Sequence, residues 1–269
     1  MIVGIGDNCL DYYLPPINLR FAGGNVLNLV SNLQKHGAQS VYMGTVGNDE
    51  SGNFIISTLC DNGIYTDHIR QVVGKTGLTE IALENGDYII KSEKYGVSNT
   101  YELTDTTIDF LKENASLIHL SLTGKAAEII PIIKDLNIPL SCDISYFYDN
   151  FDKEFWECLL PYLSYVFISA GAVKSQEKIY ALIHEISSYG TKCITVTRGA
   201  KGCIAYCEGE FLSYHSILSP SKVVDPLGAG DAFISGFLFS TLSAGNKLKD
   251  YVETGSRWAA EACNHHGAW

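Results

Sequence analysis

Residues 225–231 (DPLGAGD) place two carboxylates around a run of small residues, and an apolar helical pattern follows directly. Its apolar positions, among them Phe233, Ile234 and Phe237, recur at the spacing of one helix face. A small-residue turn that opens a helix exposes backbone N–H groups, and the helix dipole adds partial positive charge there. Such a turn is suited to holding a phosphate group.

Asp231 is unusual in this turn, because its carboxylate would repel a bound anion. The arrangement is useful if Asp231 accepts a proton from a hydroxyl while the N–H groups of Gly228, Ala229 and Gly230 stabilise a transferring phosphoryl group. The alternative is an ordinary turn into a helix, with Asp231 as a first-turn acid. The first interpretation predicts a kinase of small hydroxylated molecules.

A second group of polar residues lies near the N-terminus. Gly23 and Gly24 precede Asn25, and Asn28 lies three residues further, on the same expected helix face. Glycines allow a ligand to approach the backbone, and amide side chains both donate to and accept from sugar hydroxyls. A glycine-rich loop with an Asn helix cap is the alternative.

Two acids, Asp7 and Asp11, follow the first expected strand, 2–5. Carboxylates at the carboxyl end of a strand can accept hydrogen bonds from pairs of hydroxyls. The alternative is that both are solvated turn acids.

The elements that must position these residues alternate along the chain, which predicts an α/β fold with a mostly parallel central sheet and helices on both faces. Active sites in such folds lie at the carboxyl ends of the strands. The length of 269 residues suits one domain, 1–269. We expect strands at 2–5, 41–46, 117–120, 139–143, 165–169 and 192–197, and helices at 25–36, 50–61, 125–136, 153–160, 174–189, 229–244 and 248–264.

Segment 77–94 breaks this alternation, because two alternating strands flank an Asn85-Gly86 turn signal. A hairpin alone is marginally stable, so it must pack on something. With a strand at 9–14 and another near Phe21, it could form a small lid sheet. An antiparallel edge of the main sheet is the alternative.

The composition of the chain argues against several kinds of partner and binding site. The net charge of −11 argues against nucleic acid or a membrane surface as partner, since both are polyanions. No apolar run reaches the roughly 20 residues of a membrane span, and the start lacks a signal peptide, so we expect a cytoplasmic protein. We expect all eight cysteines to be free thiols. A nicotinamide site at Gly4-Ile5-Gly6 fits poorly, because the third glycine of that motif is replaced by Cys9.

The string 225–231 resembles the DTxGAGD signature of the ribokinase-like (PfkB) carbohydrate kinases, with Pro226 where Thr is usual. The resemblance covers nearly the whole chain. It implies a ribokinase-like fold with a β-lid, dimerisation through that lid, Asp231 as the catalytic base and the amides of 228–230 as the anion hole. It also implies a set of sugar-binding residues, namely Asp11, Gly23, Gly24, Asn25 and Asn28, with Asp7 as a weaker assignment.

The resemblance extends to the nucleotide end. Residues 197–202 (TRGAKG) look like the TxGxxG element of the family, which lies along ATP, and Arg198 and Lys201 add positive charge. ATP would arrive with Mg²⁺, but residues 169–172 (SAGA) replace the NxxE motif that organises the metal in many relatives, and Glu177 is out of register. The residues that hold the metal therefore stay unassigned. The residues assigned to the cofactor are Thr197, Gly199, Gly202 and Asp225.

Within this family, residues 6–11, 23–28 and 266–269 look most like the fructoselysine 6-kinases. That resemblance implies phosphorylation of the 6-hydroxyl of an amine-linked fructose, whose cationic tail needs an acid partner. Glu80, Glu84 and Asp87 are the candidates. Fructokinases and other sugar or nucleoside kinases share the quoted motifs and remain alternatives, as does a non-catalytic sugar or nucleotide sensor.

Overall fold

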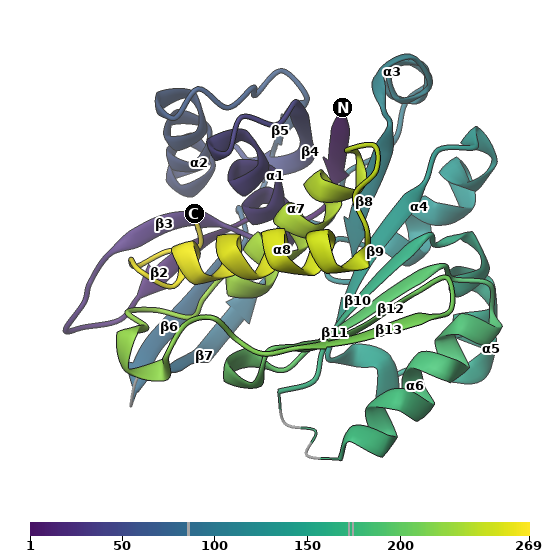
Figure 1. Ribbon diagram of the computed structural model, residues 1–269. Helices are drawn as coiled ribbons and strands as arrows, with labels where there is room; N and C mark the ends of the chain where they lie inside the picture. The colour runs from purple at the N-terminus through teal and green to yellow at the C-terminus, as the bar shows by residue number, and fades with distance from the viewer. Residues whose placement is uncertain (85–86, 172, 174) are drawn as a thin grey trace.

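The computed structural model describes residues 1–84, 87–171, 173 and 175–269. In these residues, nine strands form one twisted sheet in the order β13-β12-β11-β10-β9-β8-β1-β4-β5 (Figure 1). Neighbours from β11 to β5 are parallel, whereas β12 and β13 are antiparallel. The strands are β1 (Ile2–Ile5), β4 (Ser40–Gly47), β5 (Ile69–Val72), β8 (Leu117–Ser121), β9 (Leu140–Ser145), β10 (Tyr165–Ser169), β11 (Cys193–Thr197), β12 (Cys203–Cys207) and β13 (Glu210–Tyr214).

Helices cover both faces of this sheet (Figure 1). On β1, Ile2 packs into the hydrophobic cluster of one face and Val3 into that of the other, and all four residues of the strand are buried. This burial explains the near-continuous apolar runs of the central strands. One face carries α1 (Asn25–Lys35), α2 (Glu50–Asp61), α7 (Ala229–Thr241) and α8 (Leu248–Ala262), and the other α3 (Asp105–Asn114), α4 (Ala126–Ile133), α5 (Lys153–Leu159) and α6 (Gln176–Ser188).

A second sheet of four strands stands apart from the first, in the order β3-β2-β6-β7. The expected hairpin therefore belongs to this small sheet and is not an edge of the main one. The Asn85-Gly86 turn lies outside the described residues. The strands are β2 (Cys9–Tyr13), β3 (Arg20–Gly23), β6 (Leu78–Glu84) and β7 (Asp87–Lys94).

The predicted α/β fold class is confirmed, and the differences are local. Helix α4 ends at Ile133 and continues only as a 3-10 turn over Lys134–Leu136, after a proline at position 131. Proline removes one helical hydrogen bond and shortens the regular helix. Helix α3 was not predicted, because it buries a single residue, Leu111. Thr104 is its N-cap, and the Thr104 side chain accepts from the Thr107 N–H at 3.3 Å.

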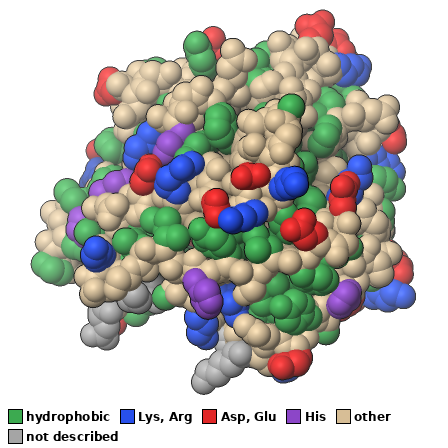
Figure 2. Space-filling model, in the orientation of Figure 1, with side chains coloured by type: hydrophobic (Ala, Val, Ile, Leu, Met, Phe, Trp, Pro, Cys, Tyr) green, Lys and Arg blue, Asp and Glu red, His purple; other side chains and the backbone are tan. Residues whose placement is uncertain are grey.

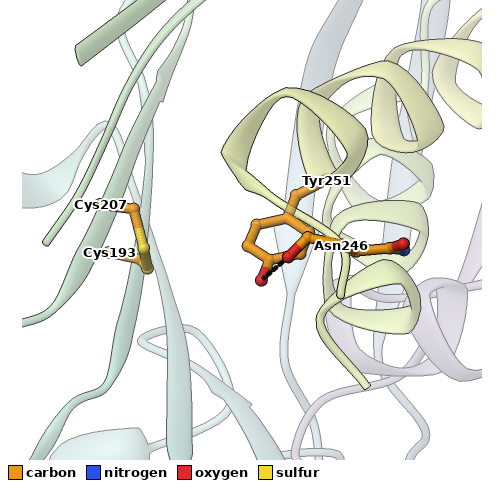
Figure 3. Close-up of a disulfide and its surroundings, with 4 residues drawn as sticks. All are labelled: Cys193, Cys207, Asn246 and Tyr251. Atoms are coloured by element: carbon orange, nitrogen blue, oxygen red, sulfur yellow. Dashed lines mark hydrogen bonds between the residues drawn. A yellow bond between two sulfur atoms is a disulfide. The ribbon is translucent and has the colours of Figure 1, made fainter. Parts of the chain in front are cut away.

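The expectation that all eight cysteines are free is wrong for two of them. Cys193 on β11 and Cys207 on β12 are joined by a disulfide (Figure 3). The antiparallel register places them directly opposite each other, with Cα atoms 4.1 Å apart. Their spacing of 14 residues matches no short cysteine motif, so the pairing depends on a register that the sequence did not reveal.

The face of the molecule in Figure 2 carries acidic and basic side chains interspersed, without a continuous field of one sign. Among the described residues, no helix is both long and apolar enough to cross a bilayer.

Candidate functional site

A cavity of about 200 Å³ lies between the carboxyl ends of the central strands and the second sheet. Asp7, Thr123, Asp143 and Ser169 reach it from the main sheet, each at or just after a strand. The second sheet and the start of α7 close the other sides. They contribute Cys9, Asp11, Thr79, Ile90, Glu93, Gly228, Gly230 and Asp231.

Asp231 lies in the first turn of α7 and is 9% exposed. The amide Nδ2 of Asn28, on α1, donates to its Oδ2 at 2.8 Å. Burial raises the pKa of Asp231 well above its usual range, the hydrogen bond from Asn28 lowers it, and nearby carboxylates, first that of Asp143, raise it further. A carboxylate of raised pKa is a stronger proton acceptor than one in water.

The N-terminus of α7 faces the same cavity. Gly228 caps the helix with a φ of 75°, and a Cβ there would lie 2.3 Å from the Cβ of Ala268, so both the backbone and the space require glycine. At Gly230 a Cβ would meet nothing within 4 Å. The Ala229 N–H donates to the Pro226 carbonyl at 3.2 Å, and the open space beside Gly230 lets an anion approach the start of the helix.

Asp7 holds the start of α1. Its Oδ2 accepts from the backbone N–H of Asn25 at 2.9 Å, and its Oδ1 accepts from the Ser121 hydroxyl at 2.6 Å. Gly24, the N-cap, has a φ of 110°, and a Cβ there would lie 2.4 Å from the Cα of Asn8. These contacts fix the turn that presents Asn25 and Asn28 to the cavity.

Asp11, on β2 of the second sheet, is 4% exposed, and burial raises its pKa to about 7. The Cys9 thiol donates to its Oδ1 at 3.2 Å. Gly23 does not line the cavity. A Cβ at this position would lie 1.9 Å from Oδ2 of Asp11. Gly23 therefore makes room for the Asp11 carboxylate.

Asp143, at the end of β9, was not singled out in the sequence. It is 8% exposed and lines the cavity, and burial raises its pKa to about 7. Its Oδ1 accepts from the Ser145 N–H at 2.8 Å. An acid at the carboxyl end of an expected strand, as at Asp7, could have indicated this site. The run 139–143 was used to predict a strand only.

A second cavity, of about 360 Å³, lies beside the first and shares Thr197, Pro226 and Gly230 with it. Its lining is mainly apolar and comes from the 197–202 loop, residues 216–218 and helices α7 and α8. The structure thus brings Gly199 and Gly202 beside the opening turn of α7. The shared residues place that turn between the two cavities.

Asp225 lies elsewhere than its assignment implies, because it lines neither cavity and is fully buried. It accepts hydrogen bonds from the Tyr13 hydroxyl, from the Leu227 N–H at 2.9 Å and from the Gly267 N–H at 3.4 Å. These contacts connect the signature to β2 and to the C-terminal segment.

Glu177 is also outside the cavities and accepts from the Ser175 hydroxyl at 2.6 Å. Among the described residues, no group of three or more His, Cys, Asp or Glu side chains is arranged to enclose a metal ion. The first cavity nevertheless gathers oxygen donors and contains no Lys, Arg or His among its described lining residues. Such a donor set fits a hard divalent cation that is held mainly by phosphates and water.

Comparisons with known proteins agree with this geometry. A family model described as pfkB family carbohydrate kinase matches residues 19–128 and 166–269. The chain is 30% identical over 265 residues to fructoselysine 6-kinase of Escherichia coli, covering 98% of each chain. It is also 30% identical over 272 residues to the fructosamine kinase FrlD of Bacillus subtilis, covering 100% of this chain and 92% of that protein.

Among solved structures, ribokinase of Arabidopsis thaliana in complex with ribose and ATP superposes with a TM-score of 0.84 at 20% sequence identity. The match covers 99% of this chain and 93% of the ribokinase. The central sheet, its helices and the second sheet therefore form a ribokinase-like fold. The chain belongs to the pfkB family of carbohydrate kinases and is an ATP-dependent sugar kinase.

Proposed function

We propose that this kinase transfers the γ-phosphoryl group of ATP to the 6-hydroxyl of fructoselysine or a related fructosamine. The observation that carries the proposal is the acidic lining of the first cavity. Asp7, Asp11, Asp143 and Asp231 line it, with no basic side chain among its described residues. A sugar that bears a protonated amine favours the ionised form of these acids, whereas a neutral hexose does not.

Asp231 and the opening turn of α7 perform the transfer. Asp231 accepts the proton of the sugar hydroxyl as that oxygen bonds to the γ-phosphorus, and the bond from phosphorus to the β–γ bridging oxygen breaks to release ADP. The N–H groups of Gly228, Ala229 and Gly230 stabilise the charge on the migrating group. A cation that enters the cavity lowers the pKa of Asp231 and favours its ionised form.

The second cavity is proposed as the nucleotide site. Its apolar walls suit a base, and the shared residues Thr197 and Gly230 direct the phosphates toward α7. Asp143 is the carboxylate that would hold Mg²⁺, in place of the acid that the family carries after β10. The ion would supply positive charge to the phosphate oxygens.

The test is a substrate panel with ATP that compares fructoselysine with fructose, ribose, ketodeoxygluconate and adenosine. We expect kcat/KM for fructoselysine to exceed the others at least about tenfold, which corresponds to about 1.4 kcal/mol of differential stabilisation of the transition state. The NMR spectrum of the product should show phosphorus coupled to the protons on carbon 6. Equal or better turnover of fructose contradicts the proposal.

We also propose a homodimer that forms through the second sheet. Strand β7 lies at the end of its strand order and exposes Ile89 and Ile90 by 39% and 45%. An exposed apolar edge strand favours pairing with another chain. Ile89 does not line the cavity, so Ile89→Lys should yield monomers in light scattering and leave the substrate preference unchanged. A wild-type protein that is monomeric at high concentration contradicts the dimer.

A further inference from the structure

Three residues that are paired across neighbouring strands of the second sheet form a row that faces the substrate cavity. Asp11 on β2 pairs with Thr79 on β6, and Thr79 pairs with Glu93 on β7. All three residues line the cavity. Directly paired residues project from the same face of a sheet, and neighbouring strands lie roughly 4.8 Å apart, so the row spans about 10 Å.

The two ends of this row differ in environment. Asp11 is 4% exposed, whereas Glu93 is exposed to solvent. Burial is the main cause of the raised pKa of Asp11, and Glu93 is among the charges that raise it further. Glu93 accepts from the Tyr95 hydroxyl at 3.0 Å, which leaves its other oxygen for a ligand. The row therefore runs from a closed end to an open end.

The closed end also carries an unsatisfied acceptor. Oδ1 of Asn28 is buried without a hydrogen-bond partner, while Nδ2 of the same amide donates to Asp231. Asn28 is 4% exposed and lines the cavity. A buried amide oxygen without a partner is costly, and a ligand hydroxyl would satisfy it. This observation places the hydroxylated part of a ligand beside Asn28, Asp231 and Asp11.

Glu80 and Glu84, two of the three hairpin acids proposed as partners of a cationic tail, do not line the cavity. Glu84 forms an ion pair with Lys91 at 2.7 Å. Glu80 follows Thr79 on β6 and does not line the cavity. The side chain of Asp87 lies outside the described residues. Glu93 is the described acid of this hairpin that lines the cavity.

We infer that Glu93 determines specificity by binding the protonated amine of the substituent on the sugar, while Asn28 and Asp11 bind the sugar hydroxyls. This inference deepens and rests on the proposed function. The amine-bearing chain leaves the cavity along β7, where Ile90 and Tyr95 also line the opening and can contact its methylene groups.

The test compares Glu93→Gln with the wild type on fructoselysine and on fructose, each with ATP. We expect KM for fructoselysine to rise about fivefold, the upper end for a solvent-exposed ion pair, with kcat unchanged. KM for fructose should stay within about twofold. Glu93→Lys should raise KM for fructoselysine further, and the effect of Glu93→Gln should shrink at high salt. Glu80→Gln is the matched control and should leave both substrates unaffected.

The outcomes separate the two claims. A wild-type enzyme that does not distinguish fructoselysine from fructose overturns the proposed function and, with it, the role of Glu93. A selective wild type whose preference is undiminished in both Glu93 variants overturns the assignment of Glu93 and leaves the proposed function in place. Equal losses on both substrates also overturn the assignment, because they indicate a general disturbance of the second sheet.

Discussion

Nδ2 of Asn28 donates a hydrogen bond to Oδ2 of Asp231 at 2.8 Å, across 203 positions of the sequence. The bond joins α1, which follows β3 in the chain, to α7, which opens with the signature. It uses one carboxylate oxygen of Asp231 and leaves the other for a substrate. The orientation of the base is therefore set by a residue that itself lines the substrate cavity.

Asp231→Asn should lower kcat by about 10²–10⁴-fold, the usual contribution of a positioned general base. The amide keeps the shape of the side chain but does not accept the proton of the hydroxyl. Calorimetric titration should show that binding of the sugar and of a non-hydrolysable ATP analogue persists. Full turnover by this variant would refute the role of Asp231 as the base.

Asn28→Leu should shift the acid limb of the pH profile of kcat/KM upward. The hydrogen bond from Asn28 lowers the pKa of Asp231, so its removal allows burial and the neighbouring carboxylates to raise that pKa further. Because Asn28 also lines the cavity, KM for the sugar should rise. Asn53→Leu, at an exposed position of α2 outside the cavity, is the control. An unshifted acid limb in Asn28→Leu contradicts the prediction.

Gly228→Ala and Gly230→Ala should separate stability from activity. The first adds a Cβ at a φ of 75° and 2.3 Å from Ala268, so we expect at least about 2 kcal/mol of destabilisation in urea unfolding. The second adds a methyl group to open space, so stability should stay within about 0.5 kcal/mol while kcat falls. A Gly230→Ala enzyme of normal activity would argue against an anion hole at this turn.

The central sheet and the residues of the signature could be predicted because their signals are local. Apolar runs of strand length alternate with helical periods, and the small residues before Phe233 mark an open helix start. The sequence alone therefore predicted Asp231 and Asn28 as site residues. Local pattern did not provide the strand register, and the Cys193–Cys207 disulfide and the row from Asp11 to Glu93 both depend on register.

Roles were harder to predict than positions. Gly23 and Asp225 lie next to residues of the cavity in sequence, yet Gly23 lies under the Asp11 carboxylate and Asp225 is buried behind the signature. Neighbours in a tight turn point in different directions, which their residue types do not reveal. Asp143 was missed for the complementary reason, since a single acid that ends an apolar strand forms no motif.

Asp143→Asn should make the ligand-free protein less sensitive to pH. The pKa of Asp143 is raised to about 7 in the folded chain from 3.8, so its stabilising contribution is complete below about pH 4 and is lost as pH rises through 7. The variant should be more stable than the wild type at pH 8, by on the order of 2 kcal/mol, and not at pH 4. Asp61→Asn, at an exposed position of α2, is the control for urea unfolding at both pH values. A wild-type advantage at pH 8 contradicts this sign.

Tyr13→Phe and Asp225→Asn should each destabilise the fold by about 1–3 kcal/mol, because each disrupts a buried hydrogen bond between β2 and the signature. The double variant should lose less than the sum, with a coupling of at least about 1 kcal/mol in urea unfolding. Tyr12→Phe is the control, since that hydroxyl donates to Asn18 at an exposed site. Additive losses of stability, together with a weakened affinity of Asp225→Asn for ATP, would support the assignment of Asp225 to the nucleotide site. Strong coupling at unchanged ATP affinity identifies Asp225 as the residue that holds the opening turn of α7 against the second sheet.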